Sequence, residues 1–165
     1  MTRLFHSILL VVALASCSFA PIRIGIQDIT LPGNSSQGQI CYVKVTEGSR
    51  VGFSNATYNA SATYTSNAPL GGGDVEIRVY GRSSEPADTC VATSDVDIAL
   101  SEPLTLSPSE TKPKPIEIGG GMYGGDLADL IRRDAYWLGA ALTGGATLSL
   151  EERIKLTDGV VSVYF

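Results

Sequence analysis

The side chains best suited to acid–base or metal chemistry are sparse in this sequence. Its only histidine is His6, and its three cysteines are Cys17, Cys41 and Cys90. If the first sixteen residues are removed, as argued below, no imidazole remains for a Ser-His-Asp or Cys-His site. Zinc and copper sites of the usual type also lose their imidazole ligands. The sequence therefore favours a non-enzymatic protein without a metal or other cofactor.

Carboxylates offer two weaker kinds of site. Asp95 and Asp97 are two positions apart in an expected strand, so both should face outward. Together with Glu85 and Asp88 they could supply the oxygen ligands of Ca²⁺, although a solvated strand face is the ordinary explanation. A carboxylate pair acting as a hydrolase is a further alternative, but nothing in the spacing marks such a pair.

A glycine-rich run between an expected strand and an expected helix matches a nucleotide-binding pattern. Gly119-Gly120-Gly121-Met122-Tyr123-Gly124 fits G-x-G-x-x-G, in which the backbone approaches phosphates at a helix N-terminus. The strands before it alternate, however, and no further βαβ unit is indicated. We expect a glycine-rich loop that crosses the end of a sandwich.

The aromatic residues of the last third of the chain could form a binding surface. Tyr123, Tyr136 and Trp137 are concentrated there, and aromatic side chains dominate many binding sites. A tryptophan buried in the core of a sandwich is the alternative.

The elements that must position these residues begin with an export signal. Arg3 supplies a positive charge, Leu4 to Leu14 is mostly apolar, and small residues follow up to Cys17. This is the layout of a secretory signal. The apolar run is too short for a membrane-spanning helix, which needs roughly 20 residues.

The ending Leu14-Ala15-Ser16-Cys17 resembles the lipobox of bacterial lipoproteins. The resemblance implies cleavage before Cys17, attachment of fatty acyl chains such as palmitate, and anchoring of the exported protein to a membrane of the cell envelope. The domains expected are a signal peptide over 1–16, a short tether over 17–21 and one domain over 22–165. A plain signal cut after Ala20 is the alternative, but Pro21 fits that site poorly; an uncleaved anchor is a third. No family is identified for the mature domain.

Charge excludes one class of partner. Of the 12 basic residues only Arg3 lies in the signal, and 17 residues are acidic, so the mature chain carries a net charge near −6. Nucleic-acid binding requires a positive surface, which this balance does not provide. It also gives no reason to expect a polybasic membrane patch.

Once Cys17 is assigned to the anchor, Cys41 and Cys90 can pair in only one way. In an exported chain two such cysteines predict a disulfide, with two separate buried thiols as the alternative. In the chain-entropy model, a disulfide that closes a loop of roughly 50 residues stabilises the folded protein by about 3–4 kcal/mol.

Alternating apolar residues predict an all-β domain. The clearest strands contain Ile22–Ile26, Tyr58–Tyr64 and Val75–Tyr80, and Val96, Ile98 and Leu100 indicate another. A change of phase after Gln27-Asp28 predicts a bulge, and Asp158-Gly159 predicts a hairpin turn. One short helix is expected near 126–133, capped by Asp126, and a strand is favoured over a helix for Tyr136–Leu142. We expect an antiparallel β-sandwich of roughly nine to ten strands, immunoglobulin-like in architecture only.

These features predict a lipid-anchored structural or interaction module of the cell envelope, with an unidentified envelope protein as a candidate partner. The main alternative is a small outer-membrane β-barrel, because the length suits eight strands and the sequence ends in an aromatic residue, Phe165.

Overall fold

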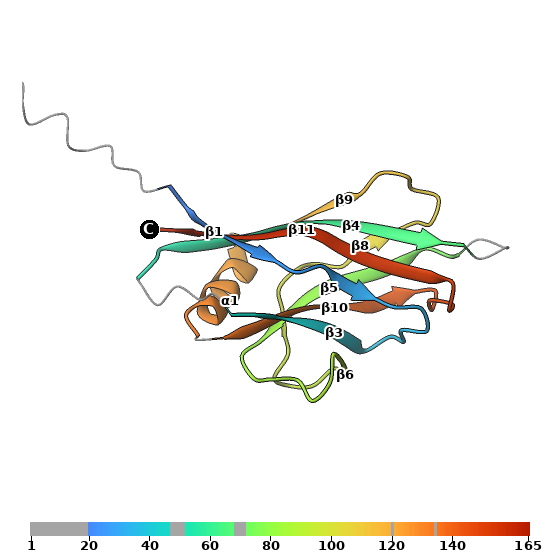
Figure 1. Ribbon diagram of the computed structural model, residues 1–165, viewed down its shortest axis with the longest axis horizontal. Coiled ribbons are helices and arrows are strands. Elements are labelled where there is room, and N and C mark those ends of the chain that lie inside the picture. Colours follow the sequence, from blue (N-terminus) through green and yellow to red (C-terminus); the bar gives the residue numbers. More distant parts are fainter. Residues whose placement is uncertain (1–19, 47–51, 68–71, 120, 134) are drawn as a thin grey trace, which may run out of the picture.

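A computed structural model of the chain describes residues 20–46, 52–67, 72–119, 121–133 and 135–165 (Figure 1). These residues form eleven strands and one helix, so the fold is mostly β as predicted. The elements are β1 (Ile22–Ile26), β2 (Ile29–Leu31), β3 (Gln39–Val45), β4 (Asn55–Ser66), β5 (Val75–Arg82), β6 (Cys90–Ala92), β7 (Ile98–Ala99), β8 (Leu104–Leu106), β9 (Lys114–Ile118), α1 (Gly121–Ile131), β10 (Tyr136–Gly145) and β11 (Glu152–Tyr164).

The strands form two antiparallel sheets. In the first sheet the order is β1-β11-β4-β9, and β2 also pairs with β11. In the second sheet the order is β6-β3-β10-β5-β7, and β8 also pairs with β5. The two sheets face each other as layers, with α1 at the end where β1 begins and β11 ends (Figure 1). This arrangement confirms the predicted antiparallel sandwich.

The core lies between the sheets and follows the alternation in the sequence. On β5, Val75, Ile77 and Val79 are each at most 1% exposed, while Glu76 between them is exposed. Burying one such side chain stabilises the fold by about 1.5–3 kcal/mol. The period-2 pattern of β5 therefore identified its buried face correctly.

A change of phase occurs at the same level in two neighbouring strands. Ile26 and Ile29 both point into the core across the break between β1 and β2, which pair with β11 on either side of Asp158. In β11, the register against β4 shifts by one residue between Thr157 and Val160. The bulge expected at Gln27-Asp28 therefore has a counterpart in β11, and the extra residue there keeps both strand halves facing the core.

The hairpin predicted at Asp158-Gly159 is wrong. Both residues lie inside the continuous strand β11, and Asp158 adopts a left-handed backbone conformation with φ of 55°. Asp-Gly suits a two-residue hairpin because such residues tolerate positive φ, and the same tolerance serves a bulge.

Strand β10 confirms the strand favoured for Tyr136–Leu142 and lies in the middle of the second sheet. It is buried on both faces. Tyr136 and Leu138 point into the main core, whereas Trp137 and Ala141 pack with Ile40 and Tyr42 in a small cluster on the outer face.

The helix begins five residues earlier than predicted. It spans Gly121–Ile131 instead of 126–133, so the expected glycine-rich loop is partly helical and Asp126 lies within the helix. Leu127, Leu130 and Ile131 are buried between the sheets. Tertiary burial of this apolar face stabilises helical turns that a glycine-rich sequence alone would disfavour. In the part of the chain that the structure describes, no helix is long and apolar enough to cross a membrane.

Two expected core positions are wrong. Val96 lies in a turn and is 46% exposed, and Ile98 belongs to the two-residue strand β7 and is 37% exposed. Only Leu100 of that predicted strand is buried. Leu150 is likewise exposed, because it lies in the turn before β11.

Candidate functional site

The predicted disulfide is present. Cys41 of β3 and Cys90 of β6 lie directly opposite each other, with their Cα atoms 4.0 Å apart, and their sulfur atoms are bonded. Cys41 points into the core. The bridge fastens β6 to the second sheet. The other predicted site cysteine, Cys17, lies outside the described residues.

The three aromatic residues proposed as a binding surface are not brought together. Tyr136 is fully buried in the main core, and Trp137 lies on the opposite face of the second sheet. The Lys44 ammonium lies 5.4 Å from the centroid of the Trp137 ring and so covers it. Tyr123 is on α1, where its hydroxyl donates a hydrogen bond to Glu102 Oε1 at 2.7 Å.

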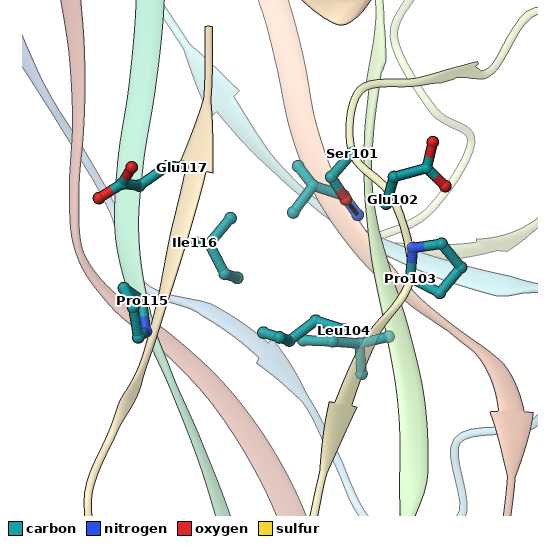
Figure 2. Close-up of a pocket in the computed structure, with 9 residues that line it drawn as sticks. Ser101, Glu102, Pro103, Leu104, Pro115, Ile116 and Glu117 are labelled. Carbon is teal, nitrogen blue, oxygen red and sulfur yellow. Dashed lines mark hydrogen bonds between the residues drawn. The ribbon is translucent and has the colours of Figure 1, made fainter.

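A groove opens instead between the edges of the two sheets, and we call it the edge groove. One wall is the edge strand β9, and the other is the segment 101–104 that leads into β8 (Figure 2). Its volume is about 200 Å³. It is lined by Ile77, Val79, Ser101, Glu102, Pro103, Leu104, Pro115, Ile116 and Glu117.

The interior of the edge groove is apolar. Ile77 and Val79 of β5 are each 1% exposed, and Ile116 projects from β9 into the space between the walls (Figure 2). Glu102 and Glu117 stand on opposite walls with their carboxylates turned away from that space (Figure 2). The groove is therefore suited to apolar contacts, with negative charge along both rims.

Prolines mark both walls of the edge groove. Pro115 pairs with Ser61 inside β9, and Pro103 immediately precedes β8. A proline has no backbone N–H to donate to another strand, and edge strands commonly carry proline and charge for this reason. Side-chain contacts therefore have a larger part in any binding along this groove than continuous strand pairing.

On one rim of the edge groove, Glu102 is hydrogen-bonded to Tyr123 of α1. Its carboxylate accepts the hydrogen bond from Tyr123, and this bond raises the pKa of the Tyr123 phenol. Arg78 Nη2 lies 4.0 Å from Glu102 Oε2. A ligand that approaches this rim therefore meets a carboxylate that already has two partners.

The expectation that Asp95 and Asp97 form an outward strand face is wrong. Neither residue belongs to a strand, and the Asp97 side chain is fully buried. Its Oδ1 accepts a hydrogen bond from the Tyr42 hydroxyl at 2.7 Å and lies 3.5 Å from Arg82 Nη1. Burial, followed by the hydrogen bond to Asp97, raises the pKa of Tyr42. This carboxylate thus fastens the segment 83–97 over the outer face of the second sheet.

Within the described ranges, no three histidine, cysteine, aspartate or glutamate residues gather as a group that could hold a metal ion. The calcium hypothesis at Glu85, Asp88, Asp95 and Asp97 therefore has no support from the geometry, because Asp97 is engaged with Tyr42 and Arg82.

A buried carboxylate that was not expected from the sequence lies at the start of β11. Glu152 occupies an inward position of β11 and is 4% exposed. It accepts hydrogen bonds from the Tyr64 hydroxyl (2.7 Å), Ser66 Oγ (2.9 Å) and the Ser149 backbone N–H (2.7 Å). The signal for this site in the sequence is a charged residue, Glu152, at a position where the alternation of the strand requires an apolar one. Its hydroxyl partners, Tyr64 and Ser66, lie on the neighbouring strand β4.

Comparison with known proteins does not identify a family for this chain. No protein-family model matches the chain, and no curated protein matches its sequence. The fold therefore defines only a structural class, an antiparallel β-sandwich with one disulfide and a groove at its open edge.

Proposed function

We propose that this protein is an exported lipoprotein that is anchored to a membrane of the cell envelope through Cys17 and acts there as a non-enzymatic structural or interaction module. The anchor is supported by the charged start, the short apolar run and the lipobox-like ending at Cys17.

The observation that carries the proposal is the Cys41–Cys90 disulfide. Disulfides persist in oxidising compartments and are rare in reducing ones. Two of the three cysteines are joined in the folded domain, and the third is the residue at the lipobox position. Each cysteine then has a role that fits an exported lipoprotein.

The edge groove supports an interaction role. Its floor is made of core side chains such as Ile77 and Val79, and its rims carry Glu102 and Glu117. We infer that it accommodates a segment of an envelope protein that inserts apolar side chains and has basic residues beside them, because such a segment complements both the floor and the rims. The lack of histidine in the mature chain supports a binding role over catalysis.

Mass spectrometry of the mature N-terminus tests the anchor. We expect the chain to begin at Cys17 and to carry a diacylglyceryl group and acyl chains. Cys17→Ser should remove this mass and release the protein from the membrane fraction. An unmodified chain that begins at Pro21 would contradict the proposal.

Photo-crosslinking in intact cells tests the interaction role. A photoreactive residue at Glu117, on the rim of the edge groove, should give discrete crosslinked products. The matched control position is Leu150, which is 82% exposed and does not line the groove. Equal product patterns at the two positions would argue against the groove as a binding site.

A further inference from the structure

Two strands of the first sheet carry apolar side chains beyond the covered core, and they do so at the same end. On β1, Ile24 and Ile26 are buried, but Ile22 in the same phase is 48% exposed. Val161 and Val163 of β11 are fully buried, whereas Phe165, which directly follows the strand, is 43% exposed. Alternation along β1 places Ile22 on the inward face, past the last buried residue of that strand, and Phe165 continues the inward phase of Val161 and Val163 just beyond the end of β11.

Three exposed apolar residues lie at this end of the sheet, and we call them the anchor-end patch: Ile22 and Phe165 on the inward side, and Tyr164, which alternates with Val163 and Phe165, on the outward side. Ile22 pairs with Val163 in the ladder between β1 and β11, so it lies beside the last residues of β11. Tyr164 is 38% exposed, and its carbonyl accepts hydrogen bonds from the backbone N–H and the hydroxyl of Ser54. The start of β1, the end of β11 and α1 all lie at this end of the sandwich (Figure 1).

The patch is distinguished from the rest of the described surface. Among the described residues, six large apolar side chains are exposed, and three of them form this patch. Val96 lies in the segment 83–97, which covers the outer face of the second sheet, and Ile98 directly follows that segment. Leu150 lies before β11, at the opposite end of that strand. Grouped exposed apolar residues indicate an interaction surface, whereas single ones need no explanation.

The position of Cys17 in the chain indicates what covers the patch. Cys17 precedes Ile22 by only five residues, and an extended chain spans at most ~3.6 Å per residue, so the two are separated by about 18 Å or less. A lipid chain on Cys17 would therefore hold the anchor-end patch close to the bilayer surface. Aromatic and aliphatic side chains at such a boundary enter the interface between headgroups and acyl chains.

We propose that the anchor-end patch docks into the interface of the bilayer that holds the lipid, so that the sandwich stands on the end bearing Ile22, Tyr164 and Phe165. This inference rests on the proposed lipid anchor. It fixes the orientation of the molecule: the end with Leu150 and Glu152 points away from the membrane.

Fluorescence quenching by brominated phospholipids tests the docking on the full-length, lipidated protein in vesicles. Phe165→Trp should be quenched at least twofold more than the parent protein, whose only tryptophan is the covered Trp137. The matched control Leu150→Trp places an exposed indole at the opposite end and should show no quenching beyond the parent. Ile22→Trp provides a second reporter in the patch in case Phe165→Trp disturbs the end of β11.

The mass of the same sample separates the two proposals. An N-terminus without lipid overturns both the anchor and the docking. A lipidated protein in which the patch reporters and Leu150→Trp are quenched equally overturns the docking alone and leaves the anchor intact.

Discussion

At the scale of single residues, Glu152 shows how a carboxylate is accommodated in an apolar core. A buried charge without partners is costly, but this one receives three hydrogen bonds from donors on β4 and on the turn before β11. The hydrogen bond from the Ser149 backbone N–H, with further bonds from Tyr64 and Ser66, lowers the pKa of Glu152 to about 2. The Ser149 bond also holds the turn that precedes β11.

This low pKa predicts a pH dependence of stability. The unfolded chain protonates Glu152 near its ordinary pKa of 4.5, whereas the folded chain does so near 2. The stabilisation is therefore complete above pH 4.5 and is lost as the pH falls towards 2. In urea unfolding at a series of pH values, Glu152→Gln should flatten this part of the profile, and the exposed neighbour Glu151→Gln should not. An unchanged acid slope in Glu152→Gln would contradict the assignment.

At neutral pH, Glu152→Gln should also lower the free energy of unfolding by about 1–3 kcal/mol. The carboxylate accepts from the Tyr64 and Ser66 hydroxyls with one oxygen and from the Ser149 N–H with the other. In glutamine one of these oxygens is replaced by an amide nitrogen, which donates and cannot accept, so one side of this arrangement loses its acceptor. Urea unfolding at pH 7 measures the change, with Glu151→Gln as the control.

Two buried tyrosines predict opposite outcomes when their hydroxyls are removed. Tyr136 is fully buried, and its hydroxyl makes no hydrogen bond to any described residue. Tyr136→Phe should leave the melting temperature unchanged or raise it, because an unpaired buried hydroxyl costs free energy. Tyr64→Phe should cost about 1.5–3 kcal/mol, because it removes a hydrogen bond to a charged group. A large destabilisation in Tyr136→Phe would reveal a partner for that hydroxyl.

At the scale of elements, the bulge in β11 keeps both halves of a long strand in phase with the core. Without the extra residue, either Ile154 and Leu156 or Val161 and Val163 would face away from it. Asp158 accommodates the bulge with φ of 55°, a conformation that β-branched residues avoid.

The bulge can be tested by substitution at Asp158. Asp158→Val should lower the free energy of unfolding by about 1–3 kcal/mol, because it places a β-branched residue in a sparsely populated backbone region. Asp158→Gly should be neutral or stabilising, since glycine adopts this conformation without steric cost. Thermal unfolding of the two variants measures the difference, and equal losses would argue against the left-handed conformation.

At the scale of the whole molecule, the disulfide joins segments that are 49 residues apart and fastens the three-residue strand β6. Cys41→Ala and Cys90→Ala should each lower the free energy of unfolding by about 3–4 kcal/mol, a large share of the roughly 5–15 kcal/mol of a typical domain. The double variant should be no less stable than either single variant. Two free thiols in the native oxidised protein, or additive losses in the double variant, would contradict this framework.

Much of the architecture was predictable from local pattern. Val75, Ile77 and Val79 alternate with polar residues, and alternation reports a strand with one buried face wherever it lies in the chain. Cys41 and Cys90 were predictable as a pair because elimination left only one pairing. The aromatic binding surface was wrong, and the strand expected for Tyr136–Leu142 already argued against it, because adjacent residues in a strand point to opposite faces.

The amino-acid sequence by itself determined the all-β class, the disulfide partners and most strand faces, because these depend on residue type and spacing. Tertiary structure decided the rest. Asp158-Gly159 became a bulge because β4 pairs with β11 across it while β2 and β1 pair with β11 on its two sides. Part of the glycine-rich run became helix because the end of the sandwich buries the apolar face of α1. The edge groove and the anchor-end patch likewise exist only once distant segments are assembled, since each combines residues from segments that are far apart in the sequence.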